Sequence, residues 1–205
     1  MKKSKVLLTL MCAVALVVTS VFGTLAYLQD TDKVVNTFTV GNVDITLDEA
    51  KVDANGAATD AARVKENAYK LMPGHKYDKD PIIHVGTASE DCYLFVTIVD
   101  QIAAIEADAT VAAQMAAQGW VAVPGYANTY IYTNNGAKAA VSAGADVTVF
   151  ETFTIKGDVD NNTLAAYAGK TITVNAYAVQ KDGFENTDPE VIWQTTFGAT
   201  AAPAN

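Results

Sequence analysis

Apolar and polar residues alternate along much of the chain and predict a protein built mainly of β-strands. Val43 to Leu47 and Thr171 to Gln180 alternate with a period of two, which places every second side chain on the same face of a strand. Tyr93 to Val99 is instead apolar throughout, which is typical of a strand buried on both faces. Further strands are expected at 38–40, 81–85, 120–123, 129–133, 146–155 and 191–197, with Pro124-Gly125 as the turn of a hairpin.

Two segments break the strand pattern and predict short helices. Residues 103–118 are rich in alanine, have apolar residues at helical spacing and end before Gly119. Residues 161–168 form a shorter candidate. Many short strands with one or two helical excursions predict a jelly-roll-like two-sheet β-sandwich, expected as one domain over residues 27–198.

Two other segments lack a regular pattern. Residues 50–68 are small and polar, so we interpret them as a loop or a mobile insertion. Residues 199–205 have little that can pack and are expected to form a disordered tail.

Residues 1–26 have the organisation of a secretory signal peptide. Three lysines precede an uncharged apolar run from Val6 to Phe22, and small residues follow it. Cleavage is expected between Ala26 and Tyr27. The mature protein is then secreted or held at the cell surface, and it meets the membrane only through the uncleaved signal.

Two alternatives to cleavage remain open. The apolar stretch reaches nearly to Leu28, and about 20 apolar residues are enough to span a bilayer as an anchor. A lipoprotein would use Cys12, but the residue before it is Met11 rather than a small one.

The net charge argues against nucleic acid as a partner, and the cysteine content argues against an internal disulfide. The chain has 14 basic and 23 acidic residues, a net charge of -9, and removal of residues 1–26 takes away three lysines and no acid, giving -12. Such an acidic surface repels nucleic acid and anionic lipid, so no nucleic-acid partner is expected. The mature chain keeps only Cys92, so an internal disulfide is ruled out and a small buried hydrophobic residue is the expected role.

No motif of catalytic chemistry is found in the sequence. The chain has two histidines, His75 and His84, and neither HExxH nor Gly-x-Ser-x-Gly. The two histidines could meet across strands as metal ligands, but we predict no metal, no cofactor and no enzymatic activity. Residues 158–162 resemble the start of a calcium loop, yet Thr163 stands where that loop needs glycine. We interpret them as a loop in which Asn161 or Asn162 caps the short helix.

Several short stretches, taken in order, resemble the TasA/camelysin group of secreted proteins. These stretches are GTLAYLQD at 23–30, NTFTVGNV at 36–43, LMPG at 71–74, KDPIIHVG at 79–86 and AYAVQKDGF at 176–184. His84 departs from the family pattern, which usually has asparagine there. The matching stretches touch both ends of the mature domain.

This resemblance implies a function as well as a fold. Family members are processed by a signal peptidase of the SipW type and form jelly-roll subunits of extracellular biofilm-matrix fibres. The N-terminal segment of one subunit then pairs as a strand in the next, so the partners are copies of the same chain and other matrix components. Carried onto this sequence, the subunit-assembly residues are Tyr27, Leu28, Val34, Val35, Phe38 and Val40.

Two other functions are compatible with the same sandwich. One is a monomeric surface adhesin or binding module, for which Tyr126, Tyr130 and Tyr132 would form an exposed aromatic patch. The other is a metalloprotease like camelysin, for which the sequence offers no set of metal ligands.

Overall fold

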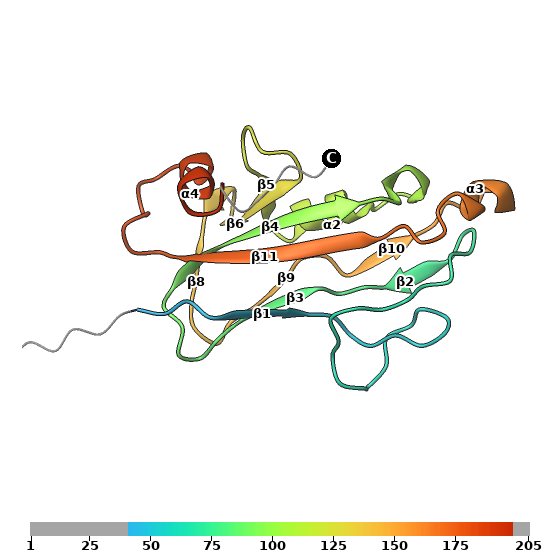
Figure 1. Ribbon diagram of the computed structural model, residues 1–205, viewed down its shortest axis with the longest axis horizontal. Helices are drawn as coiled ribbons and strands as arrows, with labels where there is room; N and C mark the ends of the chain where they lie inside the picture. Colours follow the sequence, from blue (N-terminus) through green and yellow to red (C-terminus); the bar gives the residue numbers. More distant parts are fainter. Residues whose placement is uncertain (1–40, 199–205) are drawn as a thin grey trace, which may run out of the picture. The chain divides into compact units, whose positions relative to one another are not determined.

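The computed structural model describes residues 41–198, which form antiparallel sheets in two layers (Figure 1). One layer has the strand order β11-β4-β6-β5, with β7 beside β6 and β8 beside β4, and the other holds β1-β3-β9 and β10-β2. The mainly-β prediction is confirmed and the layering agrees with a sandwich, while the jelly-roll path stays a prediction. The strands are β1 (Ile45–Asp48), β2 (Lys76–Asp78), β3 (Ile82–Val85), β4 (Cys92–Asp100), β5 (Trp120–Ala122), β6 (Thr129–Asn134), β7 (Ala137–Lys138), β8 (Ala140–Val141), β9 (Asp146–Thr148), β10 (Thr152–Thr154) and β11 (Ile172–Gln180).

Strand β4 is buried on both faces, as its continuous apolar run predicts. Leu94 and Val96 point into the core between the two layers, where Ile83 packs from the opposite sheet. Tyr93 and Phe95 point the other way, into a second apolar cluster on the outer face of the sheet. The strand therefore needs an apolar cover on each side.

Helix α4 (Pro189–Thr196) supplies the outer cover, so the prediction of a strand at 191–197 is wrong. Pro189 occupies the first turn, where its missing N–H costs nothing. Trp193 is buried, with its ring centroid 5.6 Å from that of Phe95 and 5.0 Å from that of Tyr177. Burial of an indole against two aromatic rings outweighs the β propensity of the segment.

The alanine-rich stretch at 103–118 is divided into two pieces. A 3-10 turn, η1 (Ala103–Ile105), is followed by α2 (Val111–Ala117). Between them Glu106 forms a β-bridge with Ile155, and Ala109 has a positive φ of 62°. This pairing with the opposite layer breaks the predicted single helix.

Two further segments differ in detail from their predictions. The expected strand at 146–155 is interrupted between β9 and β10. The expected short helix is α3 (Asn161–Ala165), but its cap is Asp160, whose side chain accepts a hydrogen bond of 2.7 Å from Thr163 N. The carboxylate one residue earlier thus takes the role predicted for Asn161 or Asn162.

Glu106 is a buried acid with one oxygen unpaired among the described residues. Its side chain is 3 % exposed, Oε2 accepts from Val111 N at 3.1 Å, and Oε1 has no hydrogen-bond partner. Burial raises the pKa of Glu106 to about 7, and the charge of Asp100 adds to the rise. The carboxyl group therefore binds a proton more tightly in the folded than in the unfolded chain.

We expect Glu106→Gln to stabilise the protein above neutral pH. A folded-state pKa above the ordinary value means that stability is lost as the pH rises through about 7. Urea titrations followed by tryptophan fluorescence should give Glu106→Gln an advantage over the wild type that is about 2 kcal/mol larger at pH 8 than at pH 5. The exposed Glu66→Gln is the matched control. An advantage that does not change with pH contradicts the prediction.

Candidate assembly site

A cleft of about 1210 Å³ lies beside β11, at the margin of its sheet. Within residues 41–198, β11 pairs with β4 along one edge and no strand pairs with the other. Six consecutive residues, Ile172 to Tyr177, line the cleft. Because consecutive residues, which belong to both faces of the strand, line the cleft, the strand presents its edge, and not one face, to the cleft.

The backbone groups of the free edge can be assigned from the antiparallel register. Gln101 N donates to Thr171 O at 3.0 Å, and Lys181 N donates to Asp91 O at 2.8 Å. In an antiparallel pair the residues that bond to a neighbour alternate with those that point away from it. Odd-numbered residues of β11 thus bond to β4, whereas the N–H and C=O groups of Ile172, Val174 and Ala176 point to the free edge.

The opposite wall of the cleft is formed by the end of β1 and by the loop that follows it. Leu47 to Glu49 and residues 64–71, apart from Lys70, line this side. Tyr69 anchors the loop, because its hydroxyl donates to Asp78 O at 2.9 Å and its ring contacts that of Phe153 edge-on. Burial raises the pKa of Tyr69, so this hydroxyl keeps its proton.

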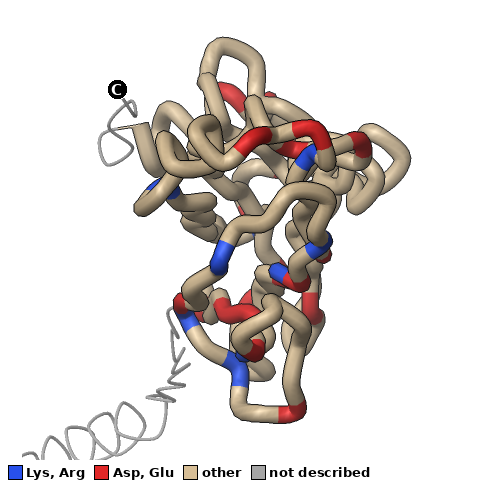
Figure 2. The backbone as a smooth tube through the Cα atoms, turned by 90° about the vertical axis from the view of Figure 1, so that its right-hand side faces the viewer, with Lys and Arg blue, Asp and Glu red and all other residues tan. Residues whose placement is uncertain are grey.

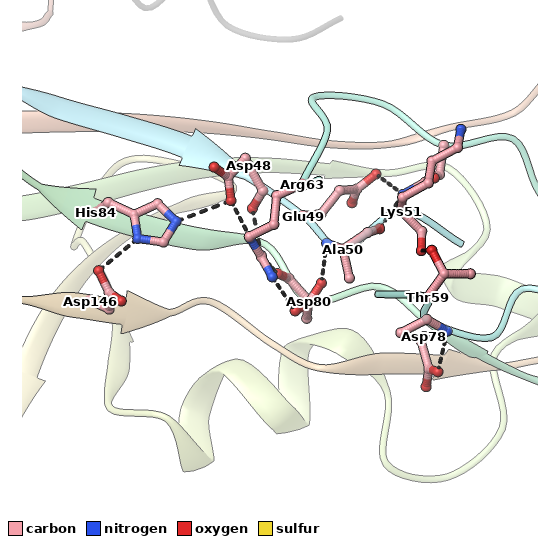
Figure 3. A network of polar contacts seen from close by, with 12 residues as sticks. Asp48, Glu49, Ala50, Lys51, Thr59, Arg63, Asp78, Asp80, His84 and Asp146 are labelled. Carbon is pink, nitrogen blue, oxygen red and sulfur yellow. Dashed lines mark hydrogen bonds and ion pairs between the residues drawn. The ribbon is translucent and has the colours of Figure 1, made fainter. Parts of the chain in front are cut away.

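Arg63 ties the loop to β1 and to the turn before β3 (Figure 3). Its Nε donates to Asp48, one Nη donates to Asp80 Oδ2 at 2.9 Å, and the other donates to Asp80 O at 2.8 Å. Asp80 Oδ1 also accepts from Ala50 N at 2.6 Å. The predicted loop at 50–68 is therefore a loop fixed by a planar, multidentate cation.

His84 on β3 lies between two carboxylates from the neighbouring strands (Figure 3). Nε2 is 3.0 Å from Asp48 Oδ1 on β1, and Nδ1 is 2.6 Å from Asp146 Oδ1 on β9. Burial lowers the pKa of His84, but the hydrogen bonds and charges of Asp146 and Asp48 outweigh it and raise the pKa. Two acceptors on one ring favour the doubly protonated imidazolium.

A second ion pair is buried next to this network. Glu49 is 4 % exposed, and its Oε2 accepts from Lys79 Nζ at 2.5 Å. The other oxygen accepts from Asn67 Nδ2 at 3.0 Å, so the carboxylate is fully paired. Asn67 also accepts from Val52 N at 3.1 Å. These contacts add to those of Arg63 in holding the loop against β1.

The sequence-predicted site residues lie outside the part of the chain that the structure describes. These are the signal cleavage residues Ala26 and Tyr27 and the assembly residues Tyr27, Leu28, Val34, Val35, Phe38 and Val40. The structure therefore tests neither the cleavage site nor the assembly residues, and both stay predictions. Arg63 and its carboxylates were missed, although Arg63 is the single arginine of the chain.

The two histidines considered as metal ligands have other partners. His75 Nε2 is 2.7 Å from Asn55 O, and its ring packs against Tyr77. Within residues 41–198, no group of three or more histidine, cysteine, aspartate or glutamate residues could hold a metal ion. Cys92 is buried, and burial raises the pKa of its thiol to about 11. The nucleophilic thiolate is therefore scarce at neutral pH.

The tyrosines considered as an adhesive patch are packed. Tyr130 and Tyr132 lie against the core between the layers, and Tyr126 lies against the outer cluster.

Acidic and basic positions are interspersed along the described backbone (Figure 2). No helix among the described residues is both long enough and apolar enough to cross a membrane.

Comparison with protein-family models, with curated proteins and with solved structures gave no match for this chain. The resemblance to the TasA/camelysin group therefore stays a prediction from short stretches of sequence.

We expect His84 to make the protein more stable at acidic than at alkaline pH. Its pKa is raised in the folded state, so its contribution is complete below about pH 6.5 and is lost as the pH rises through the folded-state value. His84→Gln should cost roughly 1 kcal/mol more at pH 5.5 than at pH 8.5 in urea unfolding. Asp146→Asn should show the same trend, because it removes one of the two acceptors. A cost that is equal at both pH values contradicts this assignment.

Proposed function

We propose that this protein is a structural subunit of extracellular biofilm-matrix fibres, secreted to the cell surface and assembled by N-terminal donor-strand exchange. Residues 27–40 of one mature subunit add as a strand to the free edge of β11 in the next subunit. The partners are copies of the same chain and other matrix components, and a signal peptidase of the SipW type releases Tyr27. The function requires no catalytic residue and no cofactor.

The observation that carries this proposal is the unprotected edge of β11. Edge strands that must stay unpaired are usually short or carry proline, lysine or a bulge. Strand β11 is nine residues long, and its sequence ITVNAYAVQ contains neither proline nor a charged residue. With a cleft beside it, such an edge supports the addition of an extended segment through main-chain hydrogen bonds.

The donor segment has the composition that such an edge requires. Residues 34–40 read VVNTFTV, in which Val34, Phe38 and Val40 share one face of an extended strand. These side chains would join Val174 and Ala176, which are half-buried and packed against the core. Before cleavage the signal peptide would tether this segment in the membrane, so processing at Tyr27 would permit assembly.

Removing the donor segment should abolish filament formation. Mature chain 27–205 and truncated chain 41–205, which lacks the whole donor segment, would be purified and viewed by negative-stain electron microscopy, with circular dichroism to show that both are folded. We expect filaments from the full mature chain alone. Filaments of equal length from both chains would refute donor-strand exchange.

Point substitutions test the same idea without shortening the chain. Phe38→Ser and Val40→Ser together should reduce the sedimentable fraction by at least roughly tenfold, because each removes apolar burial worth about 1.5–3 kcal/mol. Thr37→Ala and Thr39→Ala on the other face of the strand are the matched control and should polymerise. Equal pelleting of the two double variants in ultracentrifugation would contradict the expected facing of the strand.

A further inference from the structure

The two ends of β11 differ in what lies beside them. The cleft is lined by the N-terminal two-thirds of the strand, Ile172 to Tyr177, and by residues 167–171 before it, whereas Ala178 to Gln180 do not line it. Helix α3 also contributes to its walls through Asn161, Leu164 and Ala165. The space for an added strand is therefore at the α3 end of the sandwich.

The described chain begins at the other end of β11. Asn42 O accepts from Glu90 N at 2.9 Å, and the adjacent Asp91 O accepts from Lys181 N at 2.8 Å, just past the last residue of β11. Strand β1 then runs from Ile45 towards Asp48, and Asp48 lines the cleft. The described chain thus begins at the end of the domain opposite to α3 (Figure 1).

This separation links the direction of an inserted strand to the kind of assembly it forms. Residue 40 of a donor is joined to a folded domain, which must stay outside the cleft. If the segment ran parallel to β11, residue 40 would lie near the acceptor's own Gly41, and two subunits could exchange segments reciprocally and close as a dimer. If it ran antiparallel, residue 40 would lie at the α3 end, far from Gly41, and the contact would repeat without closing.

We propose that the donor segment runs antiparallel to β11, so that residues 35–40 face Ile172–Tyr177, Val34 reaches Ala178 just past the cleft, and the donor's domain emerges beside α3. This inference rests on the proposed function, whose fibres require the open arrangement. The lengths agree, because seven extended residues span about 20 Å and the six lining residues of β11 about 17 Å. Antiparallel pairing is also the more stable per residue. Phe38 then lies opposite Val174, and Val40 opposite Ile172.

Engineered cysteines in the mature chain distinguish the two directions. Thr173 is exposed on the outer face of β11 near the α3 end. In the antiparallel arrangement it lies opposite Thr39 of the donor, and in the parallel arrangement opposite Val35. Two variants are therefore compared, Thr39→Cys with Thr173→Cys and Val35→Cys with Thr173→Cys. A disulfide forms only when the two Cα atoms lie within about 7 Å of each other. The native Cys92 is buried and stays in both variants.

After mild oxidation, we expect a ladder of covalent oligomers from the Thr39/Thr173 variant on non-reducing gels. The Val35/Thr173 variant should lose that ladder, and each single-cysteine variant should stop at dimers. Covalent dimers from Val35/Thr173 without a ladder from Thr39/Thr173 would overturn the inference in favour of reciprocal exchange. A faster-migrating monomer from either variant would overturn it in favour of insertion into the same chain.

Failure of the inference and failure of the proposed function give different results. If filaments form and require residues 27–40 but neither cysteine pair cross-links, the stated pairing with β11 is overturned, and fibre formation still stands. If the wild-type mature chain forms no filaments, both proposals fall.

Discussion

The structure depends on one strand, β4, that is apolar on both faces and must be covered on both. Leu94 and Val96 require the second layer of the sandwich, and Phe95 requires the cluster that α4 builds around Trp193. The edges of β4 are satisfied by β11 on one side and by β6 and β8 on the other. The two layers, helix α4 and the strand order thus follow from one nine-residue segment whose first five residues are all buried.

The same requirement explains why β11 has an open edge. To pair with the whole of β4, β11 has to be as long as β4, and the register joins all nine residues of one to all nine of the other. Its core-facing positions carry Ile172, Val174 and Ala176, and the backbone groups of those residues point to the free edge. A charge there would have to lie close to the core, so the strand lacks the usual protection against further pairing. The full-length pairing of β11 with β4 therefore both stabilises the sheet and leaves an edge that can pair with another strand.

Much of the sheet could be predicted from the sequence, because period-two alternation and the unbroken apolar run report directly on burial. Helix α4 could not be predicted from the sequence, because residues 191–197 are rich in residues favoured in strands. Whether this segment forms a helix or a strand depends on the aromatic surface that β4 presents. Glu106 broke the predicted helix at 103–118 through a bridge to Ile155, nearly fifty residues away, which no local pattern contains. The cleft could not be predicted for the same reason, because it is formed by β1, the loop at 64–71 and β11, which are remote in sequence.

The ion pairs of Arg63 and Lys79 affect the space that is open beside the free edge of β11. An added strand needs about 4.8 Å on each side of it, so the loop opposite β11 must neither collapse onto that edge nor swing away. Apolar packing alone would favour collapse, because closing the cleft would bury Leu47 and Tyr69 further. Arg63 opposes this by holding the loop to Asp48 and Asp80, and Lys79 with Glu49 adds a buried anchor. Directional contacts to charged groups fix a distance in a way that hydrophobic contacts cannot. The opening beside β11 is therefore maintained by ion pairs, of which Asp48, Glu49 and Lys79 line the cleft itself.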